Sequence, residues 1–216
     1  MSLVELIGWF ATCVGALLGL PQLVRLIRTR SVDGLSLVAW RAMLVLNLAW
    51  FAHGVRIDQL PQMVTNLVAL AVTVPLLTLL VRSKGLPLVR TLAPSLVAAA
   101  LIIAVDAYLG SLAFGLVAMI PGLFTNLGQT AELVRAPSVS GVAPLFLLLG
   151  WVNQCLWLTW ALLVHDPGTT VASSLTLAMT SFNLLWFCLR RLGMRAVFVR
   201  ASDQVQVSDE PVLVRA

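Results

Sequence analysis

The chain has 216 residues, of which 60% are hydrophobic and only 11% are charged, and its mean hydropathy is +0.98. This composition is too apolar for an ordinary soluble domain and indicates a membrane protein. The net charge of +5 is dispersed over residues at the ends of apolar runs, which argues against a nucleic-acid-binding protein.

Seven apolar stretches approach the length of about 20 residues that a helix needs to cross the core of a bilayer. Polar and helix-breaking residues separate most of them, and the joint near Asp106 is the least distinct. The sequence therefore predicts an all-α membrane protein with seven transmembrane helices. In chain order they cover residues 3–24, 37–55, 61–81, 88–107, 110–131, 143–164 and 169–189.

Two segments of the chain repeat one another. The segment LPQLVRLIRTRSVDGL, at residues 20–35, recurs 107 positions later as LGQTAELVRAPSVSGV, at residues 127–142. The offset also aligns Trp50 with Trp157, well beyond the segment itself, so we infer an internal duplication. Seven of the sixteen aligned positions are identical: Leu20/Leu127, Gln22/Gln129, Leu26/Leu133, Arg28/Arg135, Ser31/Ser138, Val32/Val139 and Gly34/Gly141.

The duplication predicts how the seven helices are grouped. Three helices followed by one linker helix make four crossings, so both copies enter the membrane in the same direction, as parallel repeats (3+1+3). We expect a first three-helix repeat over residues 1–85, a linker helix over 86–109, a second three-helix repeat over 110–193 and a cytoplasmic tail over 194–216. A solute site would lie between the repeats, near the middle of the membrane.

Charge predicts the orientation of the chain. With seven spans, the loops form two sets that face opposite sides of the bilayer. One set has Arg56 as its single basic residue, whereas the other holds ten: Arg25, Arg28, Arg30, Arg82, Lys84, Arg90, Arg135, Arg190, Arg191 and Arg195. Because basic loops are retained in the cytoplasm, we expect the N-terminus outside and the C-terminus inside, in the plasma (inner) membrane.

Several polar and aromatic residues are predicted at membrane depth, where such side chains tend to face the protein interior. Trp50 and Asn66 are 16 residues apart, Trp157 and Ser173 repeat that spacing, and Asn153 lies one helical turn before Trp157. An aromatic face beside amide and hydroxyl groups suits a neutral polyol, because the ring stacks on C–H surface while the polar groups form hydrogen bonds. Taken singly, the same residues could be interfacial anchors or ties between helices.

Pro21-Gln22 followed by Ser31-Val32-Asp33-Gly34, with a weaker second copy that contains Gln129, resembles the motif of the PQ-loop superfamily. Two copies in a chain of this length are similar to the SWEET sugar carriers, whose half-size bacterial relatives are the SemiSWEETs. The resemblance covers most of residues 3–190 and identifies Gln22 and Gln129 as the motif glutamines. The motif is more specific for the superfamily than for a substrate.

The resemblance also implies a sugar pocket. In SWEETs, a Trp on the second helix and an Asn on the third, repeated on the sixth and seventh helices, form that pocket. The segment Trp50-Phe51-Ala52-His53-Gly54 resembles the family's Trp-x-x-Tyr-Gly, and Asn66 matches the family's Asn, whereas Ser173 replaces the second Asn. The residues implied to bind substrate are Trp50, Asn66, Trp157, Ser173 and Asn153.

Prolines are the expected moving parts, because proline in a helix interior removes a backbone hydrogen bond and bends the helix. SWEETs are associated with four prolines near the cytoplasmic ends of their helices. Pro21 and Pro144 match two of these prolines, while Leu37 and Gly128 stand at the other two positions. The resemblance thus implies gating at Pro21, Pro144 and Gly128. The pair Pro121-Gly122 predicts an additional break in the fifth helix.

These features predict a transporter that is not an enzyme and needs no cofactor or metal. The favoured function is alternating-access facilitation of small neutral solutes, above all mono- or disaccharides. A proton-coupled PQ-loop carrier of amino acids or other small metabolites, and a non-transporting receptor or assembly protein, remain alternatives. None of the nine acidic residues is placed in the middle of a span, which favours facilitation over proton coupling. The expected partners are the solute and the lipid bilayer, and a homo-oligomer remains open.

Overall fold

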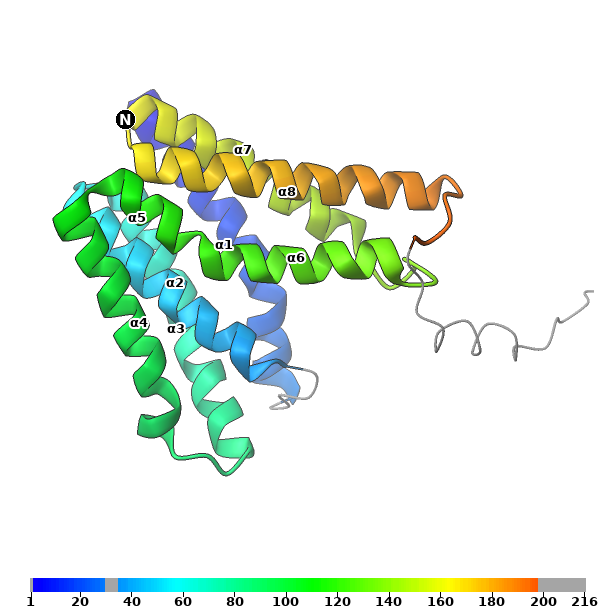
Figure 1. Ribbon diagram of the computed structural model, residues 1–216, viewed down its shortest axis with the longest axis horizontal. Helices are drawn as coiled ribbons and strands as arrows, with labels where there is room; N and C mark the ends of the chain where they lie inside the picture. The colour runs from blue at the N-terminus through cyan, green and yellow to red at the C-terminus, as the bar shows by residue number, and fades with distance from the viewer. Residues whose placement is uncertain (1, 30–34, 198–216) are drawn as a thin grey trace, which may run out of the picture.

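The fold is that of a computed structural model, which describes residues 2–29 and 35–197 (Figure 1). All regular structure in these ranges is helical, so the predicted all-α class is confirmed. The predicted motif residues Ser31–Gly34 lie outside the described residues. The helices are α1 (Leu3–Thr29), α2 (Leu37–Arg56), α3 (Leu60–Ser83), α4 (Leu88–Leu109), α5 (Ser111–Ala118), α6 (Ile120–Arg135), α7 (Pro144–Val164) and α8 (Pro167–Arg191).

The helices have the length and composition of membrane spans. Six segments are long and apolar enough to cross a membrane when α5 and α6 are counted as one, and Leu3–Gly19 of α1 is a shorter apolar helix. The seven predicted spans are therefore present, and several run a few residues beyond their predicted ends. Large side chains such as Val89, Leu101 and Leu185 are exposed, as expected for helix faces that contact lipid.

The fifth predicted span is interrupted. Helix α5 ends at Ala118 and α6 begins at Ile120, with Met119 between them. Pro121 lies in the first turn of α6 and has no N–H to donate to the carbonyl group of Val117, four residues earlier. The break therefore falls just before the predicted pair Pro121-Gly122.

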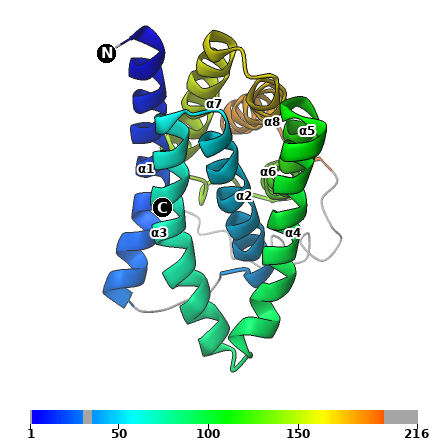
Figure 2. The same cartoon turned by 90° about the vertical axis from the view of Figure 1, so that its left-hand side faces the viewer.

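The helices of each repeat pack in the same order. Helix α3 contacts both α1 and α2, which do not contact each other within the described residues, and Figure 2 shows α3 between them. Helix α8 likewise contacts α5 and α6 as well as α7. We call α1–α3 the first triplet and α5–α8 the second triplet, because α5 and α6 together correspond to one span. Helix α4 joins the two triplets and packs mainly against α2 and α5.

The two triplets meet at one end of the bundle and diverge toward the other. They contact each other through α1 with α7 and through α2 with α5 and α6. Figure 1 shows α7 and α8 extending to the right from the shared end, while α2, α3 and α4 extend downward. The shared end carries Asp58, Asp106 and Asp166 and is called the acidic end. The opposite end carries Arg82 and Arg191 and is called the basic end.

Small residues allow close helix contacts at the acidic end. A Cβ atom on Gly115 of α5 would overlap the backbone of Gly168, at the start of α8. A Cβ atom on Gly8 of α1 would lie only 2.9 Å from the side chain of Pro61 on α3. Gly8 and Pro61 stand 107 positions before Gly115 and Gly168. The two triplets therefore hold their first and third helices together at equivalent places.

Candidate solute-binding site

A central cavity of about 320 Å³ lies between the two triplets. Helices α2 and α3 contribute one wall, and α5 to α8 contribute the other. All five residues that the sequence predicts to bind substrate line this cavity: Trp50, Asn66, Asn153, Trp157 and Ser173. The structure thus brings the five side chains together, and their role in binding remains a prediction.

The wall of the central cavity is polar but uncharged. Among the described residues that line it, none is acidic or basic. Amide and hydroxyl groups both donate and accept hydrogen bonds, so the cavity suits a neutral polar solute, whereas an ion would enter without a counter-charge. Ten lining residues carry such groups: Asn47, Gln62, Thr65, Asn66, Asn126, Asn153, Gln154, Thr169, Ser173 and Thr176.

Equivalent positions of the two repeats face the cavity in pairs. The 107-residue offset relates Trp50 to Trp157, Asn66 to Ser173, Asn47 to Gln154 and Gln62 to Thr169. Sequence reasoning did not include Gln62 and Thr169, because both stand at the ends of predicted spans, where polar residues usually mark a helix boundary. The signal that could have found them is the same offset.

Aromatic neighbours hold the two cavity tryptophans. The Trp50 ring meets the Phe114 ring edge-on, with ring centroids 4.8 Å apart, and meets the His53 ring in the same way at 5.7 Å. The Trp157 ring meets the buried Trp160 ring edge-on at 5.3 Å. Edge-to-face pairs at these distances are favourable. Packing therefore positions both rings before a solute arrives.

Two asparagines on the first-triplet wall each use one amide N–H within the protein. Asn47 Nδ2 donates to Thr73 Oγ1 at 3.1 Å, and Asn66 Nδ2 donates to the carbonyl oxygen of Gln62 at 2.8 Å. Both amide oxygens have no hydrogen-bond partner in the described part of the chain. Each asparagine is thus held in place and can still accept a hydrogen bond from a solute.

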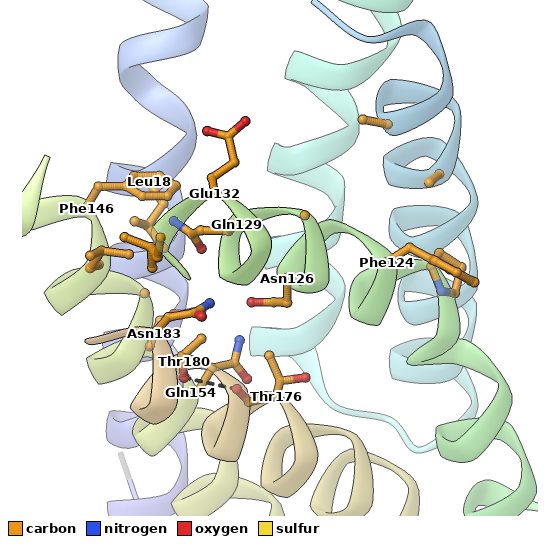
Figure 3. Close-up of a pocket in the computed structure, with 18 of the residues that line it drawn as sticks. Leu18, Phe124, Asn126, Gln129, Glu132, Phe146, Gln154, Thr176, Thr180 and Asn183 are labelled. Carbon is orange, nitrogen blue, oxygen red and sulfur yellow. Dashed lines mark hydrogen bonds between the residues drawn. The ribbon is translucent and has the colours of Figure 1, made fainter. Parts of the chain in front are cut away.

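A wide cavity of about 960 Å³ adjoins the central cavity. The two share the lining residues Asn126, Asn153, Gln154 and Thr176. Figure 3 shows Asn126 projecting from α6 on one wall, with Gln154 on α7 and Thr176 and Thr180 on α8. The wide cavity continues to the first turns of α2 and α7, at the basic end. The central cavity therefore adjoins a wider and mostly apolar space that leads toward the basic end.

Of the five predicted gating and motif residues, the structure places three in or next to the wide cavity: Gly128, Gln129 and Pro144. Gly128 and Gln129 of α6 line the wide cavity. Pro144 lies in the first turn of α7. At that position the N–H that proline lacks has no partner inside the helix, so Pro144 does not interrupt α7, and its role in gating stays a prediction. Pro21 and Gln22 belong to α1, and their side chains lie outside the described residues.

At the acidic end, a group of charged and polar side chains around three buried residues joins both triplets and α4. His53 of α2 is fully buried, and its Nδ1 lies 2.8 Å from Asp106 Oδ2 on α4. Its Nε2 lies 3.1 Å from Oδ2 of Asp166, in the turn before α8. Arg56 Nη1 donates to Asp106 Oδ1 at 2.6 Å, and the hydroxyl group of Ser111 donates to Asp166. We call these five residues the closure network.

Hydrogen-bond chemistry defines how His53 bridges the two carboxylates. A neutral imidazole has one N–H, whereas both ring nitrogens of His53 face carboxylate oxygens, so only the imidazolium form donates to both. Burial disfavours the charged form of Asp166. Hydrogen bonds from His53, Ser111 and the Thr169 backbone outweigh that effect and hold the pKa of this carboxyl well below its usual range. The network therefore fastens α2 to the start of α8.

The sequence analysis did not predict the positions of Asp106 and His53 in the closure network. Asp106 was expected at a poorly defined helix boundary, but α4 continues to Leu109, so the carboxylate lies inside the last turn of α4 and is 3% exposed. His53 had no predicted role in the site. The signal that could have found it is its place in Trp50–Gly54, where the resembling family has a tyrosine.

Two equivalent triplets around a central cavity are the plan of a membrane carrier built from parallel repeats. Residues 3–63 match the family model described as PQ loop repeat. The chain is 31% identical over 86 residues to Sugar transporter SemiSWEET of Escherichia coli (strain UMEA 3162-1), an alignment that covers 39% of this chain and 97% of that protein. The chain therefore belongs to the PQ-loop family, among its SWEET-like members.

A solved structure extends the comparison to both triplets. The fold is similar to the 3.7 Å structure of a eukaryotic SWEET transporter, with a TM-score of 0.69 and 16% sequence identity. That similarity covers 89% of this chain and all of the other chain. The resemblance to SWEETs that the duplicated loop motif predicts is thus confirmed for the fold.

Proposed function

We propose that this protein is an alternating-access facilitator of small neutral solutes, with a mono- or disaccharide as its substrate. The observation that carries the proposal is the convergence of Trp50, Asn66, Asn153, Trp157 and Ser173 on one uncharged cavity. Tryptophan rings can stack on the C–H surface of a sugar while amide and hydroxyl groups bind its hydroxyl groups. The similarity to a protein named as a sugar transporter supports the same class of substrate.

Alternating access requires that the acidic end opens while the basic end closes. The central cavity is continuous with the wide cavity toward the basic end, and the closure network lies on its acidic side, behind Trp50. His53 and Asp166 belong to different triplets, so their contact must break when the acidic end opens. We propose that the repeat at 1–85 rocks against the repeat at 110–193, with the linker 86–109 moving together with α2.

The closure network favours a second candidate function, a proton-coupled carrier of amino acids or other small metabolites. Ionisable side chains at membrane depth are costly and often form proton relays. His53 and Asp106 are both buried within helices, at 0% and 3% exposure. The first candidate remains the stronger one, because the described residues that line the central cavity carry no charge to recognise an amino acid.

Counterflow in proteoliposomes tests both candidates. Liposomes that contain the purified protein and an unlabelled sugar should take up the labelled sugar, and an imposed pH difference should cause no accumulation. The physical reason is that a facilitator only equilibrates its solute. Accumulation that a protonophore abolishes would support the proton-coupled carrier. Uptake of amino acids without uptake of any neutral mono- or disaccharide would contradict the proposed substrate.

We further propose that the acidic end and the N-terminus face the outside of the plasma (inner) membrane, because the basic loops lie at the other end. Cysteines at the two ends of α3 test this orientation after Cys13, Cys155 and Cys188 are replaced. An impermeant maleimide should label Leu60→Cys in intact cells and Ser83→Cys only after permeabilisation, since both sites are exposed. The reverse pattern of labelling would overturn the orientation.

A further inference from the structure

We infer that Gln62 and Thr169 determine specificity, by binding hydroxyl groups of a neutral sugar ring in the central cavity. This inference rests on the proposed function and deepens it. Gln62 precedes Asn66 by four residues on α3, and Thr169 precedes Ser173 by four residues on α8. Both helices begin at the acidic end, so Gln62 and Thr169 form a polar layer one turn nearer to that end than Asn66 and Ser173.

Gln62 and Thr169 share three properties. They are 107 positions apart, so they occupy the same place in the two repeats, and both line the central cavity. Gln62 is 2% exposed and Thr169 is 4% exposed. Gln62 Oε1 is buried without a hydrogen-bond partner in the described part of the chain, and Thr169 Oγ1 forms no well-aligned hydrogen bond there, although the Asp166 carboxylate lies close to it. A buried polar atom without a partner is rare in proteins, so Gln62 Oε1 at a cavity position points to a ligand that completes it, with Thr169 at the equivalent position of the other repeat.

The unpaired atoms define what the ligand must offer. The amide oxygen of Gln62 can only accept hydrogen bonds, and Asn153 Oδ1, on the facing wall, is a second buried acceptor without a partner. The ligand must therefore present at least two hydrogen-bond donors. Hydroxyl groups supply them without charge, whereas an ammonium group would have no counter-charge in this cavity.

The size of the central cavity restricts the ligand further. Its volume of about 320 Å³ is near the lower end of the range of roughly 300–1,000 Å³ found for small-molecule sites. Such a space suits one sugar ring better than two. The described lining thus fits one neutral ring with several hydroxyl groups, and the second ring of a disaccharide would lie in the adjoining wide cavity.

Thr169 also contacts the closure network, and Gln62 also contacts Asn66. The Thr169 backbone N–H donates to Asp166 Oδ2 at 2.8 Å, and the same oxygen faces His53 Nε2. The carbonyl oxygen of Gln62 accepts the hydrogen bond that orients the Asn66 amide. A hydroxyl group bound at this layer would therefore meet the turn that keeps the acidic end closed and the residue that positions the predicted asparagine.

Thermal unfolding of the purified protein in detergent tests the inference. Thr169→Val and Gln62→Met should leave the solute-free Tm unchanged or higher, because each replaces a polar group without a well-aligned hydrogen bond by an apolar group of similar shape. For the hexose that stabilises the wild type most, among glucose, galactose, mannose and fructose, the Kd should weaken about five- to a hundredfold. That change equals about 1–2.8 kcal/mol at 1.4 kcal/mol for each factor of ten.

The matched control is Thr159→Val, an exposed position on α7 outside both cavities, which should leave hexose binding unchanged. Wild-type hexose binding in both variants would overturn the inference and leave the proposed function standing. A lower solute-free Tm in both variants would also overturn it, because the two polar groups would then be structural. No stabilisation of the wild type by any of the four hexoses would overturn the inference, while counterflow of a disaccharide would leave the proposed function standing.

Discussion

His53→Leu should lower the unfolding temperature of the purified protein by about 6–20 °C. The substitution removes the bridge between Asp106 and Asp166 and leaves both carboxylates buried without it. Removing one partner of a buried ion pair typically costs about 3–5 kcal/mol, and about 1 kcal/mol shifts the Tm of a chain of this size by about 2–4 °C. Thermal unfolding in detergent, without added solute, measures the effect.

A compensated variant separates charge from packing. Asp106→Asn and Asp166→Asn, combined with His53→Leu, should recover most of the lost stability, because no buried carboxylate is then left without its histidine. Asparagine at position 166 can still cap α8. The exposed His165→Asn is the control and should have little effect. If the compensated variant is no more stable than His53→Leu alone, the cost arises from the lost stacking of His53 on Phe114.

The fold could be predicted because two strong constraints act on the sequence. The first is the length of the apolar stretches, which determines where the helices can cross the membrane. The second is the internal duplication, which leads both copies to pack alike, as the equivalent contacts of Gly8 and Gly115 illustrate. The same offset placed Trp50 and Trp157 at matching positions, so that both line one cavity. The break before α6 follows from a single local cause, the missing N–H of Pro121.

The closure network could not be predicted, because it depends on which helices meet in space. His53 is 53 residues from Asp106 and 113 residues from Asp166 along the chain. The duplication gives no help either, since the offset aligns His53 with Trp160, which cannot bridge two carboxylates. The unpaired oxygen of Gln62 is likewise a tertiary property that no spacing reveals.

The two repeats therefore contribute alike to the central cavity and differently to the acidic end. The central cavity uses paired positions, so both triplets contribute similar chemistry to binding. The acidic end uses unpaired positions: the first triplet supplies the cationic bridge at His53, and the second supplies the carboxylate at Asp166. Because the two opposite charges lie on different triplets, they attract each other only when the acidic end is closed. Two like charges at equivalent positions would repel each other.

Trp50→Ala and Trp157→Ala should each raise the half-saturating sugar concentration in counterflow about five- to a hundredfold. A ring that a bound sugar covers contributes on the order of 1–3 kcal/mol to binding, and about 1.4 kcal/mol corresponds to a factor of ten. Trp50→Phe and Trp157→Phe keep an aromatic face and should have smaller effects. Rates are to be compared at equal amounts of reconstituted protein.

Trp40→Ala provides a matched control on the same helix as Trp50. Trp40 packs against the cluster of Leu44, Leu77 and Val81 and lines neither cavity. Its truncation should lower the Tm, because it removes apolar packing, while the half-saturating concentration stays the same. If Trp50→Ala behaves like Trp40→Ala, with reduced stability and unchanged half-saturation, Trp50 supports the bundle and does not stack on the sugar. The amide and hydroxyl groups of the cavity would then have to account for recognition without it.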